Sequence, residues 1–176
     1  MPNFYTYLIA SLPMLHFNGR APFTFERFLK NCLTFIPEQD FEILKTASID
    51  GEYVFKNIHS VLREFQEFDT DLRDELAKIR ASHKHEDASK YLRRERYIEP
   101  PIAHLAMNAH RSPSPLEGER ILDEARWQKL EELSFGHYFD LEFLLIYGLK
   151  LLILERWERI YTADKVGLLE ETLITN

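Results

Sequence analysis

The chain has 176 residues, 22 of them basic and 29 acidic, so its formal net charge is −7. This acidity argues against general binding to DNA or to anionic membranes, because their phosphates repel a negative surface. Cys32 is the only cysteine, which excludes an internal disulfide framework and favours a reducing compartment, the cytoplasm. With only 6 Gly, the chain does not suit a β-rich domain with many tight turns. Its aromatic residues are unusually numerous, at 13 Phe, 8 Tyr and 2 Trp.

The N-terminal segment is apolar, but we do not expect a signal peptide. No basic residue precedes Arg20, and Pro13 stands where a cleavage site would need small residues. Residues 4–10 are rich in aromatics, yet no second strand is available to pair with them. We therefore expect a helix or an extended aromatic arm packed on a helical bundle.

Helix signals dominate after residue 24. Thr24 is the predicted N-cap of a first helix, and Pro37 opens a second helix that stops before Asp50. Eight apolar residues then recur at spacings of three and four, typical of one helix face. They are Val54, Ile58, Val61, Phe65, Phe68, Leu72, Leu76 and Ile79. The pattern predicts a long helix over residues 52–82, about 45 Å in length at 1.5 Å per residue.

The rest of the chain also has helical patterns. A short helix is expected from Pro100, and a longer one over residues 116–133 after a loop at residues 112–115. An apolar helix is expected to begin at residues 139–140 and run to Ile160. Thr162 is the expected cap of one last helix.

These elements predict an all-α fold, a helical bundle with one long central helix and an N-terminal aromatic arm. We expect a single helical domain over residues 1–176. Sub-units 1–111 and 114–176, separated by the Ser-Pro loop, are an alternative division.

No motif in the sequence indicates catalysis. His83 and His85 are two positions apart and point to different helix faces, so they do not share a metal ion. Cys32 lies among apolar residues, as an inert buried thiol does. No nucleophile elbow, phosphate-binding loop or dinucleotide fingerprint occurs. We expect no metal, no cofactor and no enzymatic activity.

One basic stretch stands out from the acidic remainder of the chain. Residues 78–96 carry a net charge of +4, and the other residues together carry −11. Its basic residues are Lys78, Arg80, Lys84, Lys90, Arg93, Arg94 and Arg96. We expect the patch of Lys90, Arg93, Arg94 and Arg96 to dock an acidic protein partner, with nucleic acid the less favoured occupant.

The run over residues 143–154 is apolar on nearly every helix face. Such a helix must be covered on all sides, either at the centre of a bundle or by a partner. The apolar run of residues 141–154 includes Glu142 and Lys150 and is shorter than the roughly 20 residues that a membrane span needs. We therefore expect no transmembrane span.

Three segments together resemble an uncharacterised bacterial family encoded within V-type (A/V-type) ATPase operons. They are YLIASLPML at 7–15, LRDELAKIRA at 72–81, and LDEARW at 122–127 followed by FDLE at 139–142, YGLK at 147–150 and ERW at 155–157. Members of that family stand where the operon would otherwise encode the socket subunit, the all-helical component that joins the central rotor stalk to the membrane ring.

The resemblance implies a non-catalytic, peripheral component that is similar to the socket subunit and couples the stalk to the ring. Its partners would be the stalk and the ring, and it would lie in the cytoplasm, peripheral to the membrane through the complex. The resemblance assigns a signature helix to Tyr147, Lys150, Glu155, Arg156 and Trp157, with Asp123, Arg126 and Trp127 as its packing and ion-pair partners.

Alternative functions remain open at this point. A full socket has about three related helical units, which needs more than one ordinary domain. The chain could thus be a reduced socket, an assembly factor or a piece that needs its own copies, and a homo-oligomer is compatible with it. A soluble helical adaptor that uses the basic 78–96 patch is the main alternative, and a nucleic-acid-binding module is a weaker one.

Overall fold

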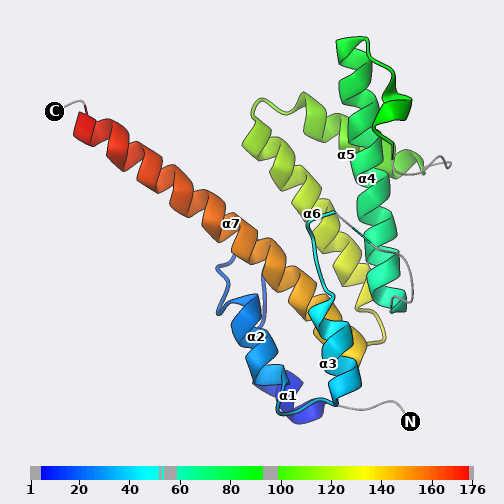
Figure 1. The fold of residues 1–176 in the computed structure, drawn as a ribbon, viewed down its shortest axis with the longest axis vertical. Coiled ribbons are helices and arrows are strands. Elements are labelled where there is room, and N and C mark those ends of the chain that lie inside the picture. The colour runs from blue at the N-terminus through cyan, green and yellow to red at the C-terminus, as the bar shows by residue number, and fades with distance from the viewer. Residues whose placement is uncertain (1–4, 52, 54–58, 93–98, 175–176) are drawn as a thin grey trace. The chain divides into compact units, whose positions relative to one another are not determined.

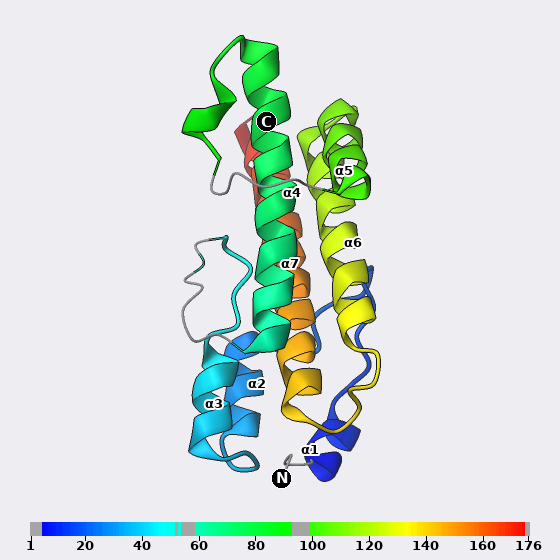
Figure 2. The same ribbon diagram turned by 90° about the vertical axis from the view of Figure 1, so that its right-hand side faces the viewer.

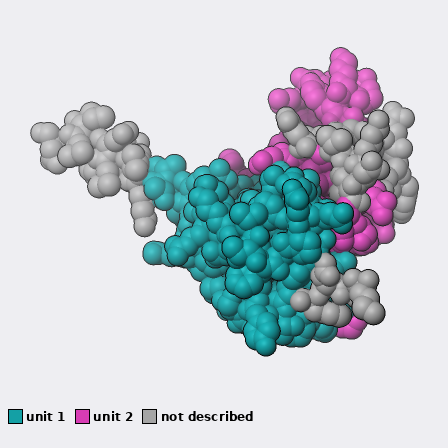
Figure 3. All heavy atoms as spheres, turned by 60° about the horizontal axis from the view of Figure 1, so that its bottom comes forward, with its two compact units in different colours: residues 1–49, 136–176 teal, residues 50–135 magenta. Residues whose placement is uncertain are grey.

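The computed structural model describes residues 5–51, 53, 59–92 and 99–174, and of residues 164–174 the backbone alone. These described residues form seven α-helices and one short 3-10 helix, with no strand among them, so the predicted all-α class is confirmed. The chain divides into two compact units (Figure 3). The first unit combines residues 1–49 with 136–176, and the second is the continuous stretch 50–135.

The first unit consists of three short helices and one long one. They are α1 (Thr6–Ser11), α2 (Phe25–Cys32), α3 (Glu38–Lys45) and α7 (Leu141–Ile174). Both α2 and α3 pack against α7, and the ribbon shows α1, α2 and α3 beside its N-terminal half (Figures 1 and 2). Thr24 caps α2 as predicted, because its side-chain oxygen accepts a hydrogen bond from the backbone N–H of Arg27 at 3.2 Å.

The N-terminal aromatic segment is helical where it is described. The backbone N–H of Tyr5 donates to the carbonyl of Phe139 at 2.6 Å, and the Tyr5 hydroxyl donates to Asp40. Leu8 and Ile9 of α1 are buried, which anchors this short helix to the unit. The structure thus selects the helix over the extended arm.

Helix α7 is longer than predicted. It runs for 34 residues without interruption, so the expectation that Thr162 caps a separate last helix is wrong. Thr162 is an exposed position inside α7. A threonine lowers helix propensity by well under 1 kcal/mol, too little to end a helix that no proline or turn interrupts.

The described residues of the second unit form three α-helices and one short 3-10 helix. Its helices are α4 (Ser60–Lys84), α5 (Pro100–Arg111) and α6 (Pro115–Leu133), with the short η1 (Ala88–Lys90) after α4. Helix α4 packs on both α5 and α6. One cluster of buried apolar residues joins these helices and consists of Leu72, Leu76, Ile102, Ala106, Ala109 and Leu122. The helical stripe predicted from Val61 onward is therefore the face that α4 buries.

The N-terminal end of the long helix differs from the prediction. Helix α4 begins at Ser60, not at residue 52, and Tyr53 and His59 are both non-helical. Val54 and Ile58 lie outside the described residues. The Tyr53 hydroxyl donates to Asp69 at 2.6 Å. In one continuous helix these two residues would be 16 positions and about 24 Å apart, so this bond is incompatible with the predicted helix.

The Ser-Pro loop joins α5 to α6 inside the second unit. Ser114 caps α6 by accepting from the N–H of Glu117 at 3.1 Å, and Pro115 is the first helical residue. The two helices approach closely because Gly118 has no side chain: a Cβ there would lie 2.7 Å from the Ala109 carbonyl oxygen.

Whether the chain folds as a single domain stays a prediction.

Candidate functional site

The aromatic residues of the signature helix are part of the core of the first unit. Tyr147 is 6% exposed, its ring centroid lies 5.2 Å from that of Phe28, and its hydroxyl donates to the carbonyl of Pro13 at 2.9 Å. Burial raises the pKa of the Tyr147 hydroxyl to about 12. Trp157 is also buried, with its ring 5.6 Å from that of Tyr161. Tyr147 therefore joins α7 to α2 and to the segment at Pro13.

The charged residues of the signature helix are half-buried. Lys150, Glu155 and Arg156 all lie between the buried and exposed classes along α7. Lys150 and Arg156 each make polar or ring contacts in the structure. Their partial burial places them at the margin of the helix's apolar face.

The predicted ion-pair residues lie in the second unit, at the centre of a buried charge network. The Arg126 guanidinium on α6 donates from Nε to Asp69 at 2.6 Å and from Nη1 to Asp123 at 2.8 Å. Arg73 Nε and the Tyr53 hydroxyl donate to the second oxygen of Asp69, at 2.7 Å and 2.6 Å. The network therefore ties α4 to α6 through a fully buried carboxylate.

The charges in this network stabilise one another. Burial by itself raises the pKa of Asp69, but the positive charges of Arg126 and Arg73 outweigh it and hold that pKa below its ordinary value. Burial likewise works against the charge of Arg126, and the two carboxylates restore it and raise its pKa. At neutral pH Asp69 and Arg126 are therefore ionised and paired.

The family resemblance assigns Asp123 and Arg126 as partners of the signature helix, whereas the bonds of Arg126 in the structure are to Asp69 and Asp123. It does not indicate Asp69, Arg73 or Tyr53. The sequence does contain a feature that could have indicated Asp69, because this carboxylate lies four residues after Phe65 on the apolar stripe of α4. A carboxylate on a buried helix face needs a cationic partner. Trp127, the neighbour of Arg126 in the chain, is 7% exposed on α6.

The predicted docking patch is described only in part. Lys90 is exposed at the end of η1, whereas Arg93, Arg94 and Arg96 lie outside the described residues. Earlier in the basic stretch, Lys84 is exposed at the end of α4. The patch as a whole therefore stays a prediction.

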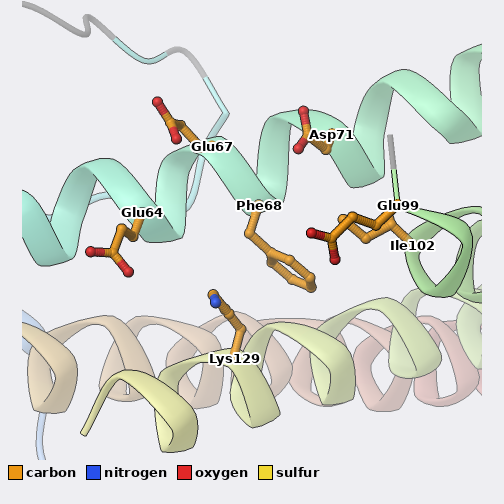
Figure 4. Close-up of a pocket in the computed structure, with 7 residues that line it drawn as sticks. All are labelled: Glu64, Glu67, Phe68, Asp71, Glu99, Ile102 and Lys129. Carbon is orange, nitrogen blue, oxygen red and sulfur yellow. The ribbon is translucent and has the colours of Figure 1, made fainter. Parts of the chain in front are cut away.

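A groove that the sequence does not indicate lies between the helices of the second unit. Its volume is about 450 Å³. It is lined by Glu64, Glu67, Phe68, Asp71, Glu99, Ile102 and Lys129 (Figure 4). Glu64 and Phe68 of α4 and Lys129 of α6 point into the space between the two helices. Glu64 and Glu99, both exposed, form an acidic rim beside an apolar floor of Phe68 and Ile102. Glu67 and Asp71 point to the side of α4 away from Lys129 (Figure 4), and Asp71 is buried.

Potential metal ligands converge in one place within the described part of the chain. These ligands are His137, Asp140 and Glu142, in the first unit. The histidines of the basic stretch have other neighbours: His83, near the end of α4, has its ring 4.6 Å from that of His110, and His85 follows as the left-handed C-cap.

The comparisons with known proteins give one match. Residues 105–168 match the model of a family described as "Protein of unknown function (DUF2764)". The matched stretch takes in much of α5, all of α6 and most of α7, just over a third of the chain. Searches of curated proteins and of solved structures found no match. Within the described residues, no helix combines the length and the hydropathy that crossing a membrane requires.

Proposed function

We propose that the chain is a non-catalytic, socket-like component of a V-type ATPase that couples the central rotor stalk to the membrane ring. The support is the resemblance of three segments to the family encoded in V-type ATPase operons. The observation that carries the proposal is where the third segment lies: its residues supply the buried centres of α6 and α7, at Arg126, Trp127, Tyr147 and Trp157.

Such a component needs rigid helices rather than reactive groups. Helix α7 spans 34 residues, about 50 Å at 1.5 Å per residue. In the second unit, Arg126 of α6 bonds to Asp69 of α4 and to Asp123 of its own helix, and all three charged groups are buried away from water. Sliding one helix past the other would expose or separate these charges, which is costly. Each unit can therefore carry force with little deformation.

The groove of the second unit is the surface we assign to a partner. Its apolar floor at Phe68 and its acidic rim fit a basic segment of another protein in the ATPase, whose aliphatic stems would cover the ring while the charges meet Glu64 and Glu99. Lys129 lies 3.6 Å from Glu132, so its charge is already partly compensated.

Co-purification from the native host tests the proposal. A tagged chain should recover the stalk and ring proteins of the ATPase in fixed proportion. The Glu64→Lys and Glu99→Lys double variant should lose them, whereas reversal of the exposed Glu117 and Glu124 on α6 should not. Recovery of the chain as a monomer with no ATPase protein would refute the proposal.

A helical adaptor or assembly factor is the second candidate, favoured by the exposure of Lys84 and Lys90. Reversing the charges of Arg93, Arg94 and Arg96 should then abolish partner capture while the groove variants retain it. If the same patch binds nucleic acid instead, its affinity must fall steeply with salt.

A further inference from the structure

Three potential metal ligands converge at the start of α7 in the first unit. His137 Nδ1 lies 2.7 Å from Asp140 Oδ2. The donor atoms of His137, Asp140 and Glu142 all lie within 4.8 Å of one another, and all three side chains are half-buried. They come from six consecutive positions, so the cluster belongs to one local segment.

We propose that His137, Asp140 and Glu142 bind one divalent transition-metal cation of the zinc type. One imidazole nitrogen with two carboxylate oxygens suits such ions, whereas calcium and magnesium prefer oxygen ligands alone. The two carboxylates balance the charge of the ion. Three protein ligands also leave a fourth position open to water or to a ligand from another molecule.

The segment is held in place by contacts outside the three ligand atoms. Asp140 Oδ1 accepts a hydrogen bond from the backbone N–H of Phe143 at 3.1 Å, which orients the carboxylate and caps α7. The carbonyl of Phe139 accepts from the N–H of Tyr5 at 2.6 Å, so the loop is tied to the N-terminal segment. Groups that orient a ligand in this way raise metal affinity.

Binding requires a small rearrangement. Bonds of about 2.0–2.2 Å to zinc place neighbouring donor atoms roughly 3 to 3.5 Å apart in a tetrahedral site. His137 Nδ1 and Asp140 Oδ2, which are 2.7 Å apart, therefore have to separate slightly to admit the ion. The ion replaces any proton that His137 shares with Asp140, and that proton leaves to solvent. The competing arrangement is a plain His137–Asp140 pair at a helix N-terminus, where the dipole favours the carboxylate.

Zinc binding to the untagged full-length chain decides between these arrangements. Isothermal titration with Zn²⁺ and elemental analysis should show one zinc per chain. His137→Ala should weaken binding at least tenfold, and so should Asp140→Asn, which keeps an oxygen to cap α7. Binding of Co²⁺ should give the visible spectrum of a tetrahedral site in the wild-type chain and not in these variants.

A matched control uses a histidine outside the cluster. His83→Ala, near the end of α4, should leave zinc affinity unchanged. Circular dichroism verifies that each variant is folded, and Glu142→Gln replaces any variant that is not. Absence of stoichiometric zinc in the wild-type chain, or equal uptake by folded His137→Ala, would overturn the proposal. Loss of binding in His83→Ala would also overturn it.

Discussion

Replacing Arg126 with methionine tests the charge network that joins α4 to α6. The side chain of Arg126 is 3% exposed, and those of Asp69 and Asp123 are fully buried. Methionine fills a similar volume but provides no charge. Asp69 would keep its bonds from Tyr53 and Arg73, whereas Asp123 would lose the guanidinium that donates to it at 2.8 Å.

The expected cost follows from the loss of that cation beside two buried carboxylates. Removing one partner of a buried ion pair typically destabilises a protein by about 3–5 kcal/mol. The two bonds of Arg126 to carboxylates would each contribute roughly 1.5–3 kcal/mol as charged hydrogen bonds. Because Asp69 retains two donors, we expect a loss of about 3–4 kcal/mol.

Urea unfolding at pH 7, followed by circular dichroism, measures this loss. An exposed control, Arg63→Met on α4, should change the unfolding free energy by less than about 0.5 kcal/mol. Adding Asp123→Leu to the Arg126 variant should recover part of the loss, because it removes a carboxylate that the guanidinium had balanced. A loss below about 1 kcal/mol for Arg126→Met would refute the argument that the buried network stabilises the second unit.

The remaining predictions concern folding, backbone, pH and reactivity. Residues 50–135 are continuous and compact, so this fragment should fold alone and show cooperative urea unfolding with helical circular dichroism. Gly51→Ala should lower the free energy of unfolding by about 2–3 kcal/mol, because φ is +83° and a Cβ would lie 2.7 Å from the guanidinium carbon of Arg73. Gly136→Ala should lower it by only about 1 kcal/mol, because φ is +88° but no atom lies within 4 Å of the added Cβ. In the folded chain the pKa of Asp69 lies below its ordinary value of 3.8, so its contribution to stability is present above that pH and is lost as acid protonates it. When the pH is lowered from 5 to 3, the urea midpoint should therefore fall less in Asp69→Asn than in the wild type. Cys32 is fully buried and burial raises its pKa to about 12, so a thiol reagent should label it only after unfolding; rapid labelling of the native chain would contradict its placement.

The elements that local chemistry defines were predictable from sequence. Thr24 caps α2, Pro100 opens α5, and Ser114 with Pro115 starts α6, each through contacts within a few residues. The start of α4 was not predictable in this way, because the bond that is incompatible with a longer helix joins Tyr53 to a side chain 16 positions away. The prediction that Thr162 caps a last helix was wrong because it considered only local sequence. A threonine alone does not end a helix that continues past it.

The candidate site shows the same division. Asp123 and Arg126 are three residues apart on one helix, a spacing that lets them pair, although the resemblance assigned both as partners of the signature helix. The bond from Arg126 to Asp69 joins residues 57 positions apart and depends on which helix faces α6. The groove is equally non-local, since its lining comes from α4, α6 and the N-terminal end of α5. Sequence periodicity indicates which face of a helix is buried, but not which neighbour covers it.

Ion transport by the assembled enzyme tests the central claim most directly. Membranes from a strain that lacks this chain should be compared with membranes to which the purified chain has been added back, with ATP hydrolysis and ATP-driven ion uptake measured together. If the chain couples the rotor stalk to the membrane ring, its absence should leave hydrolysis by the catalytic head but abolish uptake, and adding it back should restore uptake. Unchanged ion uptake without the chain would contradict the proposed function.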